Sequence, residues 1–467
     1  MPVRSLCFAP RAAASAGRKG SRFLAAVVAA AMALAPGAVR AQDLPLIRDA
    51  EIEGLMRIYT GPLFEAAGLS RSAVSVHLIN SPGINAFVAG GQRIFIYTGL
   101  LTSAKTPNEV IGVLAHETAH IAGGHLARLG IQLDKASNLA IIATLLGAAA
   151  MVGGGLAGSS GTAQAGQGVM MGGAGIAERN LLAYARAQES AADQAAVRYL
   201  DQTKQSPKGM LELFQKLANQ SLASAQYVNP YVLSHPMPLD RIRNLEQLAK
   251  ASRHFNTADP PLLVLRHELM QAKIFGFLES PQAVYQKYPV ADKSLPARYA
   301  RAITAFRIGD LKNALPVIDG LIAEIPENPY FWELKGQALL ETGRAAQAIP
   351  PLREAARLLP TNGLIRMLLA QAQLGLDGTA NAQAALETLK VAQRTENDAP
   401  RLHMLMAQAY GRLNNLPRAE LATAEMAALR GDRELATEKA TNAVKGLPPN
   451  TPEWLRAQDI LNYTKKD

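Results

Sequence analysis

Two histidines and a glutamate stand at a spacing typical of a catalytic metal site, in the sequence His116-Glu117-Thr118-Ala119-His120. On an α-helix, residues four apart lie on one face, one turn from each other, so both imidazoles can reach one ion. Zinc suits this arrangement because it accepts nitrogen ligands and keeps a fourth position for water in catalytic sites. Glu117 is then the expected general base that takes a proton from that water.

The flanking sequence predicts the helix that this motif needs. Thr106 is typical of an N-cap, Pro107 of the first helical position and Glu109 of a capping box. An apolar stripe at helical spacing follows, formed by Val110, Val113 and Leu114. The alternative is a surface helix that carries two histidines by chance, but the stripe favours a half-buried helix.

A zinc site with two histidines needs a third protein ligand from elsewhere in the chain. A second helical pattern, over residues 177–202, contains Glu189, 69 residues after His120, and Asp193 one turn later. We expect Glu189 to be the third ligand and Asp193 to accept the free ring N–H of a ligand histidine. Such a pair alone is usually a solvated helix face, and only the histidine motif in the same chain favours the metal site.

A further histidine is held in the sequence Ser234-His235-Pro236, where proline restricts the backbone before it. His235 could be a hydrogen-bond donor in the transition state, an extra zinc ligand that closes the site, or a turn residue. Arg241 could stabilise developing oxyanion charge or fix a carboxylate beside the metal. We expect the helix to continue through Gly123, Gly124 and His125. On a continuous helix His125 falls off the ligand face, and we expect it to be a surface or core histidine.

The segments before the motif predict one helix and a small sheet. Residues 44–69 have helical spacing, and residues 74–79 alternate as a β-strand does. Residues 86–89 and 93–98, which flank a turn at Gly90-Gly91, are predicted to form a β-hairpin. An extended peptide could pair with an exposed edge of this sheet, or the strands could only support the metal helix.

Five elements then occur in a fixed order: Asn85-Ala86-Phe87, the Gly90-Gly91 turn, the His116–His120 motif, Glu189–Asp193, and His235-Pro236 with Arg241. This order resembles the zinc metallopeptidases of the Ste/HtpX type over roughly residues 45–250. The resemblance implies that Glu189 is the third ligand, that Asp193 lies behind the ligands, and that His235 and Arg241 lie near the catalytic water. It points to the soluble periplasmic branch, where the histidine of the His-Pro element is thought to cap the zinc.

The first 41 residues predict a secretory signal peptide. Basic residues precede an apolar run over residues 23–34, and Val39-Arg40-Ala41 has small residues where cleavage is expected. A retained membrane anchor is the alternative, but this run is shorter than the ~20 residues that span a bilayer.

The net charge of +10 includes six basic residues of this segment, so about +4 remains for the mature chain, which argues against a nucleic-acid partner. The single cysteine, Cys7, leaves with the signal.

Residues 139–152 are almost wholly apolar, and glycine, alanine and serine dominate as far as residue 175. A helix on a membrane surface, a mobile lid over the active site and a buried helix with a loose loop remain equal interpretations. A membrane span over residues 139–158 is a further alternative.

The C-terminal half has a 34-residue period. Gly309, Gly343 and Asp377 share this interval, as do Ala314, Ala348 and Ala382. Helix pairs with small residues at their contacts have this period, and it resembles a tetratricopeptide array of four to six units. An ordinary helical bundle would explain the helices but not the interval.

The predicted fold is mainly α, with an α+β zincin-like peptidase domain and a small β-sheet followed by an α-helical tetratricopeptide solenoid. We expect a signal peptide at residues 1–41, a zinc metallopeptidase domain at 42–255, with the lid or membrane-surface segment at 139–177, and the repeat array at 256–467. The preferred hypothesis is a periplasmic zinc endopeptidase, with one Zn²⁺ per chain, whose array captures clients or contacts the outer-membrane β-barrel assembly machinery. By the resemblance, clients are misfolded or stalled outer-membrane proteins, and peripheral membrane contact is possible in this scheme. The alternative is a tetratricopeptide chaperone or adaptor whose metal site is normally closed.

Overall fold

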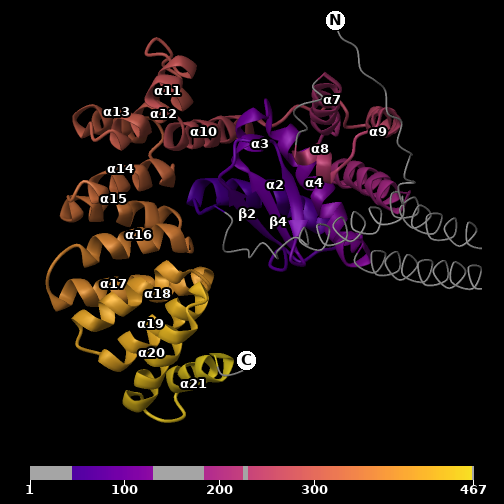
Figure 1. The fold of residues 1–467 in the computed structure, drawn as a ribbon. Coiled ribbons are helices and arrows are strands. Elements are labelled where there is room, and N and C mark those ends of the chain that lie inside the picture. The colour runs from indigo at the N-terminus through magenta and orange to yellow at the C-terminus, as the bar shows by residue number, and fades with distance from the viewer. Residues whose placement is uncertain (1–44, 130–182, 224–229, 465–467) are drawn as a thin grey trace, which may run out of the picture. The chain divides into compact units, whose positions relative to one another are not determined.

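The computed structural model describes residues 45–129, 183–223 and 230–464 (Figure 1). The expected signal peptide at 1–41 and the apolar, glycine-rich segment at 139–177 lie outside these ranges. Within them, no helix is both long enough and apolar enough to cross a membrane. The described chain is mainly helical with one small sheet, so the predicted fold class is confirmed.

The sheet has four strands in the order β1-β2-β4-β3. Strands β2 and β4 are parallel, whereas β1 pairs with β2 and β3 pairs with β4 in antiparallel fashion. The predicted strand and the predicted hairpin are both present, because alternating β-branched and aromatic residues flank the Gly90-Gly91 turn, in which both glycines have positive φ. The bounds are β1 (Leu46–Ile47), β2 (Ser75–Ile79), β3 (Ala86–Ala89) and β4 (Arg93–Tyr97).

The first helix is shorter than its predicted range of 44–69. Helix α2 (Ala50–Ala66) begins only after Asp49, whose side chain caps it by accepting hydrogen bonds from the N–H groups of Glu51 and Ile52. Before this cap, Leu46 and Ile47 pair with the end of β2 as an edge strand. The prediction of helix there was wrong, because two apolar residues that fit a helical pattern also complete a sheet.

The motif lies on helix α4 (Pro107–Ala122), which follows the short helix α3 (Thr98–Ser103). Its N-terminus is formed as predicted, since Thr106 Oγ1 accepts from the Glu109 N–H and Pro107 occupies the first turn. The Glu109 carboxylate accepts the N–H of Lys105, one residue before the cap. Every residue from Pro107 to Ala119 is buried, so α4 is the central helix of its core.

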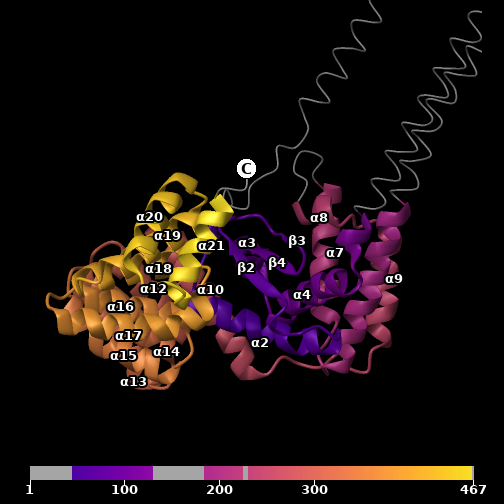
Figure 2. The same cartoon turned by 90° about the horizontal axis from the view of Figure 1, so that it is seen from below.

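Four helices complete the region around α4. A helix described over residues 183–202 crosses α4 through small side chains, because Ala119, Ala192 and Ala195 form one buried cluster. Helix α7 packs against α4, and α9 packs against α7 (Figure 2). The bounds are α7 (Lys208–Ala223), α8 (Pro230–Ser234) and α9 (Leu239–Ala251).

The C-terminal part consists of successive antiparallel helix pairs (Figure 1). The pairs that begin at residues 295, 329 and 363 repeat at the predicted interval, and Ala314, Ala348 and Ala382 are fully buried. The bounds are α10 (Pro261–Leu278), α11 (Pro281–Lys287), α12 (Leu295–Arg307), α13 (Leu311–Glu324), α14 (Pro329–Glu341), α15 (Ala345–Leu358), α16 (Gly363–Leu374), α17 (Thr379–Glu396), α18 (Pro400–Arg412), α19 (Leu416–Arg430), α20 (Arg433–Gly446) and α21 (Pro452–Thr464).

Helix α10 takes part in two cores. Its Met270 and Ile274 belong to the apolar cluster that contains α2, α4 and the sheet, whereas Leu269 and Ala272 belong to the first cluster of the array. The apolar side chains of α10 therefore join the region of the metal helix to the repeats.

A buried ionic cluster joins the same regions around Lys273 of α10. Its ammonium lies 2.8 Å from Asp49 Oδ2 and 3.4 Å from carboxylate oxygens of both Glu51 and Glu333. The hydroxyl of Tyr299 also donates to Glu51 at 2.8 Å. Burial opposes the charge of Lys273, but the surrounding carboxylates hold its pKa well above the usual range.

Candidate metal centre

The predicted ligands from α4 and from the helix over residues 183–202 converge. The Nε2 atoms of His116 and His120 lie 3.0 Å apart, and Glu189 reaches each of them with one carboxylate oxygen at 3.4 Å. Bonds of about 2.0 Å in a tetrahedral zinc site require ligand atoms about 3.3 Å apart. Two imidazole nitrogens and a carboxylate group, whose two oxygens each face one of them, fit a zinc ion at these separations.

His235 brings a fourth donor to the same point. Its Nδ1 lies 3.3 Å from His116 Nε2 and 3.1 Å from Glu189 Oε2. Ligand atoms of His116, His120, Glu189 and His235 all lie within 4.8 Å of one another. Among the interpretations left open by the sequence, a simple turn residue does not account for this position, because the imidazole is buried inside the cluster.

Arg241 and Asp193 form the layer behind the ligands. Asp193 Oδ1 lies 3.0 Å from His116 Nδ1, as expected for the acceptor of a ligand's ring N–H. Arg241 donates to both oxygens of Asp193, at 2.7 and 2.9 Å, and its Nη1 lies 2.8 Å from Glu189 Oε2. The guanidinium of Arg241 therefore orients two carboxylates, of which one faces the metal position directly.

Electrostatics keep both of these carboxylates ionised. Burial opposes the negative charge of Glu189, but hydrogen bonds with His116, His120 and His235 hold its pKa well below the usual range. For Asp193, burial is likewise overcome by the hydrogen bond from Arg241, and its pKa is also lowered. These two carboxylates thus present negative charge to a cation.

Glu117 is in a different environment. Its side chain is fully buried, and burial raises its pKa to about 7. One oxygen, Oε1, lies 3.4 Å from His235 Nε2 and 3.5 Å from the Tyr231 hydroxyl. The other, Oε2, has no hydrogen-bond partner among the described residues. A carboxyl group with a pKa near neutrality can both take and return a proton, which is what a general base of hydrolysis must do.

Tyr231 is a site residue that sequence reasoning missed. Its ring stacks on the imidazole of His235, with centroids 4.6 Å apart, and it lies on α8 just before the His-Pro element. The two residues form one aromatic wall beside Glu117. Nothing in the spacing of Tyr231 identified it, although its place one helical turn before His235 is compatible with this contact.

His125 also lies closer to the site than predicted. We expected α4 to continue through Gly123 and Gly124, but the helix ends at Ala122, and Gly124 has a φ of 62°. This left-handed residue turns the chain so that His125 Nδ1 lies 2.9 Å from His120 Nδ1. His125 is not one of the four grouped donors.

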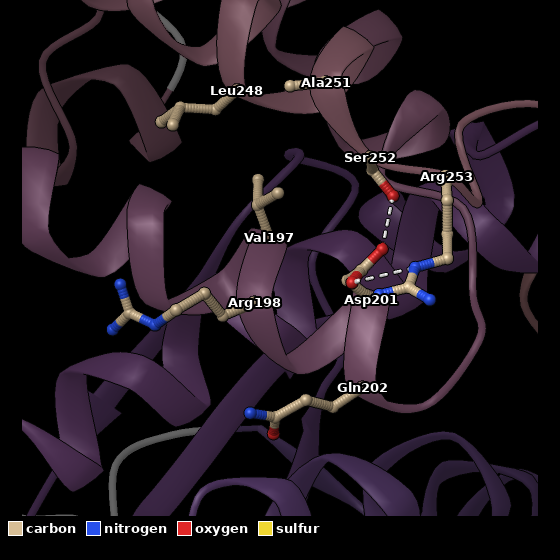
Figure 3. Close-up of a pocket in the computed structure, with 8 residues that line it drawn as sticks. All are labelled: Val197, Arg198, Asp201, Gln202, Leu248, Ala251, Ser252 and Arg253. Carbon is tan, nitrogen blue, oxygen red and sulfur yellow. Dashed lines mark hydrogen bonds and ion pairs between the residues drawn. The ribbon is translucent and has the colours of Figure 1, made fainter.

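A separate hollow lies between the end of the 183–202 helix and the end of α9 (Figure 3). Its wall includes Val197 and Leu248, and at its rim Ser252 donates to Asp201 at 2.8 Å. Neither the four grouped donors nor Glu117 line it, so the hollow is not the site of the predicted chemistry.

Residues 51–249 match the model of Peptidase family M48, and all the site residues described above lie inside this range. The chain contains an M48 metallopeptidase domain. With the grouped donors, this match identifies the protein as a metalloendopeptidase. The matched range contains strands β2 to β4, α4 and the helices around α4, whereas β1 and the repeats from α12 onward lie beyond it.

Relatives extend the comparison beyond the M48 domain. The chain is 24% identical over 409 residues to the "Beta-barrel assembly-enhancing protease" of Escherichia coli (strain K12), covering 85% of this chain and 80% of that protein. It is 25% identical over 301 residues to the "Putative beta-barrel assembly-enhancing protease" of Vibrio cholerae, covering 62% and 58%. A shorter match, 36% over 63 residues, covers 14% of this chain and 12% of the human "Metalloendopeptidase OMA1, mitochondrial".

Proposed function

We propose that this chain is a zinc-dependent endopeptidase of the periplasm that degrades misfolded or stalled outer-membrane proteins selected by its helical array. The observation that carries the proposal is the convergence of His116, His120 and Glu189 beside the buried carboxyl group of Glu117. The name of the E. coli relative, "Beta-barrel assembly-enhancing protease", supports the class of client.

His116, His120 and Glu189 are the proposed zinc ligands. Two imidazoles and one carboxylate are the ligand set of many catalytic zinc sites. A bound zinc ion would polarise the scissile carbonyl and lower the pKa of a water molecule. Asp193 would hold His116 in the tautomer that leaves Nε2 unprotonated, and Arg241 would hold Asp193 in place.

Glu117 is the proposed general base and acid. Its pKa of about 7 allows the carboxylate to take a proton from the attacking water near neutral pH. The same group can then deliver that proton to the leaving amine, which restores the carboxylate. Tyr231 and His235 border Glu117 and are suited to keep its oxygens oriented.

The free edge of β3 is the proposed binding surface for an extended substrate. In the described sheet β3 pairs only with β4, and Tyr97 donates to the carbonyl of Asn85. Since pairing groups alternate along an antiparallel strand, the N–H and C=O of Val88 face away from β4. A peptide that adds to this edge forms main-chain hydrogen bonds, which depend little on the peptide's own sequence. Such binding suits unfolded clients of varied sequence.

The repeat array and the N-terminal sequence support the remaining parts of the proposal. Arrays of helix pairs offer extended surfaces to protein partners, so α12–α21 would bind clients or the outer-membrane β-barrel assembly machinery. The basic and apolar pattern of residues 1–41 supports export. The apolar composition of residues 139–152 is compatible with peripheral contact of this segment with a membrane.

The test compares the mature chain with a Glu117→Gln variant on an unfolded outer-membrane protein. Glutamine has nearly the same shape as glutamate but cannot accept the proton, so cleavage should fall by about 10²–10⁴-fold. Both proteins are purified identically, and their zinc content is measured to be equal. Cleavage retained by the variant would overturn the role of Glu117.

A second candidate function is a chaperone or adaptor with a normally closed metal site. The contacts of His235 with both the ligand atoms and Glu117 favour it, because they fill the space that a substrate carbonyl needs. The chaperone function is supported instead if two results are obtained: neither protein cleaves although both contain zinc, and substitutions on the surface of the helical array abolish client binding.

A further inference from the structure

The two ligand histidines of α4 are backed by different acceptors. His116 has the carboxylate of Asp193 behind it, at 3.0 Å from Nδ1. His120 points its Nε2 at the same cluster, 3.0 Å from His116 Nε2, and its Nδ1 therefore faces outward. The atom that meets this Nδ1 is not a carboxylate oxygen but Nδ1 of His125, at 2.9 Å.

The chemistry of imidazole fixes the direction of this hydrogen bond. A histidine that binds a metal through Nε2 carries its proton on Nδ1. The Nδ1–H of His120 must therefore donate, and Nδ1 of His125 must accept with its lone pair. His125 then carries its own proton on Nε2. The opposite direction would leave the proton of His120 on Nε2, where it blocks metal binding.

The local backbone is built so that His125 can reach this position. Gly124 has a φ of 62°, a conformation that glycine adopts without strain. A Cβ at Gly123 would collide with the ring of His125, so glycine at this position leaves room for the ring. The residue His125 is 9% exposed, and its ring stands nearly perpendicular to that of His120, at 83°. This Gly-Gly turn ends α4 and folds His125 back toward His120.

We propose that His125 is a positioning residue of the metal centre, which accepts the Nδ1–H of His120 and so holds Nε2 of His120 unprotonated and aimed at the metal. His125 does for His120 what Asp193 does for His116, with a neutral acceptor in place of a charged one. Loss of such a partner typically weakens metal affinity by about 10–100-fold. The inference rests on the zinc site of the proposed function.

The experiment uses the mature chain with two substitutions of nearly equal shape, His125→Asn and His125→Leu. The Asn side-chain oxygen can occupy the place of Nδ1 and accept the same hydrogen bond, whereas Leu cannot. Zinc dissociation constants are measured by competition with a chromophoric chelator. We expect His125→Leu to bind zinc about 10–100-fold more weakly and His125→Asn to stay within about threefold of the unchanged chain.

Two results would overturn the inference: unchanged affinity in His125→Leu, or equal losses in both variants, since a mere packing role does not distinguish Asn from Leu. If the unchanged chain itself binds no zinc, the proposed function fails instead. Should His125→Leu not fold, nitrogen-15 NMR of histidine-labelled, zinc-loaded protein decides. We expect His120 protonated on Nδ1 and His125 on Nε2, with the His125→Asn spectrum giving the assignment, and the reverse tautomer at His125 contradicts the inference.

Discussion

The imidazole of His235 lies against the carboxyl group of Glu117, with Nε2 3.4 Å from Oε1, while its other ring nitrogen lies 3.1 Å from Glu189 Oε2. One side chain thus contacts both the proposed base and a proposed ligand. A substrate carbonyl has to enter the same space. Cleavage therefore depends on how often His235 moves out of it.

His235→Ala should raise the rate of proteolysis. If the open arrangement is populated at about 10%, removal of the side chain raises kcat/KM roughly tenfold. The measurement is cleavage of an unfolded outer-membrane protein at equal zinc content, with His254→Ala, a histidine outside the donor group, as the control. A fall in activity would instead indicate that His235 donates a hydrogen bond in the transition state.

Arg241→Ala should destabilise the zinc-free chain, because it leaves the buried carboxylates of Asp193 and Glu189 without their cation. Breaking a buried pair in this way costs about 3–5 kcal/mol. Arg241→Lys should be intermediate, since an ammonium cannot make the paired hydrogen bonds of a guanidinium. Urea unfolding gives the free energies, and Arg243→Ala, an exposed arginine on the same helix, is the matched control. Equal effects of the two alanine substitutions would contradict this role.

Val88→Pro should weaken the binding of extended substrates. Proline removes the N–H of Val88, which faces away from β4, and an edge strand tolerates it where that N–H is not paired. Loss of one main-chain hydrogen bond and the added ring should raise KM about five- to tenfold, with kcat less affected. Val88→Thr keeps the N–H and serves as control. An unchanged KM in Val88→Pro would place the substrate elsewhere.

His403 should make the stability of the array depend on pH. Burial opposes its charge, but Glu425, 3.0 Å from Nδ1, and the carbonyl of Asn397, 2.6 Å from Nε2, raise its pKa above 6.5. A raised pKa in the folded state means that the stabilisation is complete below pH 6.5 and is lost as the pH rises through the folded pKa.

His403→Gln should therefore be less stable than the unchanged chain by about 1–2 kcal/mol below pH 6.5, and the difference should shrink toward pH 9. Urea midpoints followed by circular dichroism between these pH values give the comparison. The difference between the two chains isolates His403 from other titrating groups. Parallel curves at all pH values would show that His403 is not charged in the folded array.

The sequence contained enough to predict the metal helix and the repeats. Capping and helical geometry predict α4 from Thr106, Pro107 and the spacing of the His116–His120 motif. The repeats are predicted by the 34-residue interval at which alanines such as Ala314 recur. Such features depend on residues close in the chain or on a regular interval. Prediction and structure therefore agree best for elements that depend on neighbouring residues or on a regular repeat.

Other features could not be predicted because they arise from tertiary contacts. A two-residue strand such as Leu46–Ile47 is defined by its partner in β2, not by its own pattern. Tyr231 gains its role only through stacking on His235. For His125, the spacing argument assumed a continuous helix, which would turn its side chain away from the ligand face. The left-handed Gly124 instead redirects the chain and brings His125 into contact with His120.

Helix α10, whose Met270 packs with the peptidase core and whose Leu269 packs with the repeats, limits how this protein can be recombined. An array borrowed from another protein would bring side chains suited to its own first helix, and it would remove Glu333 from the three carboxylates that surround Lys273. The repeats are thus not an interchangeable attachment. We expect lineages of this architecture to have diversified by substitution along the array, with its attachment to the catalytic part inherited as a unit.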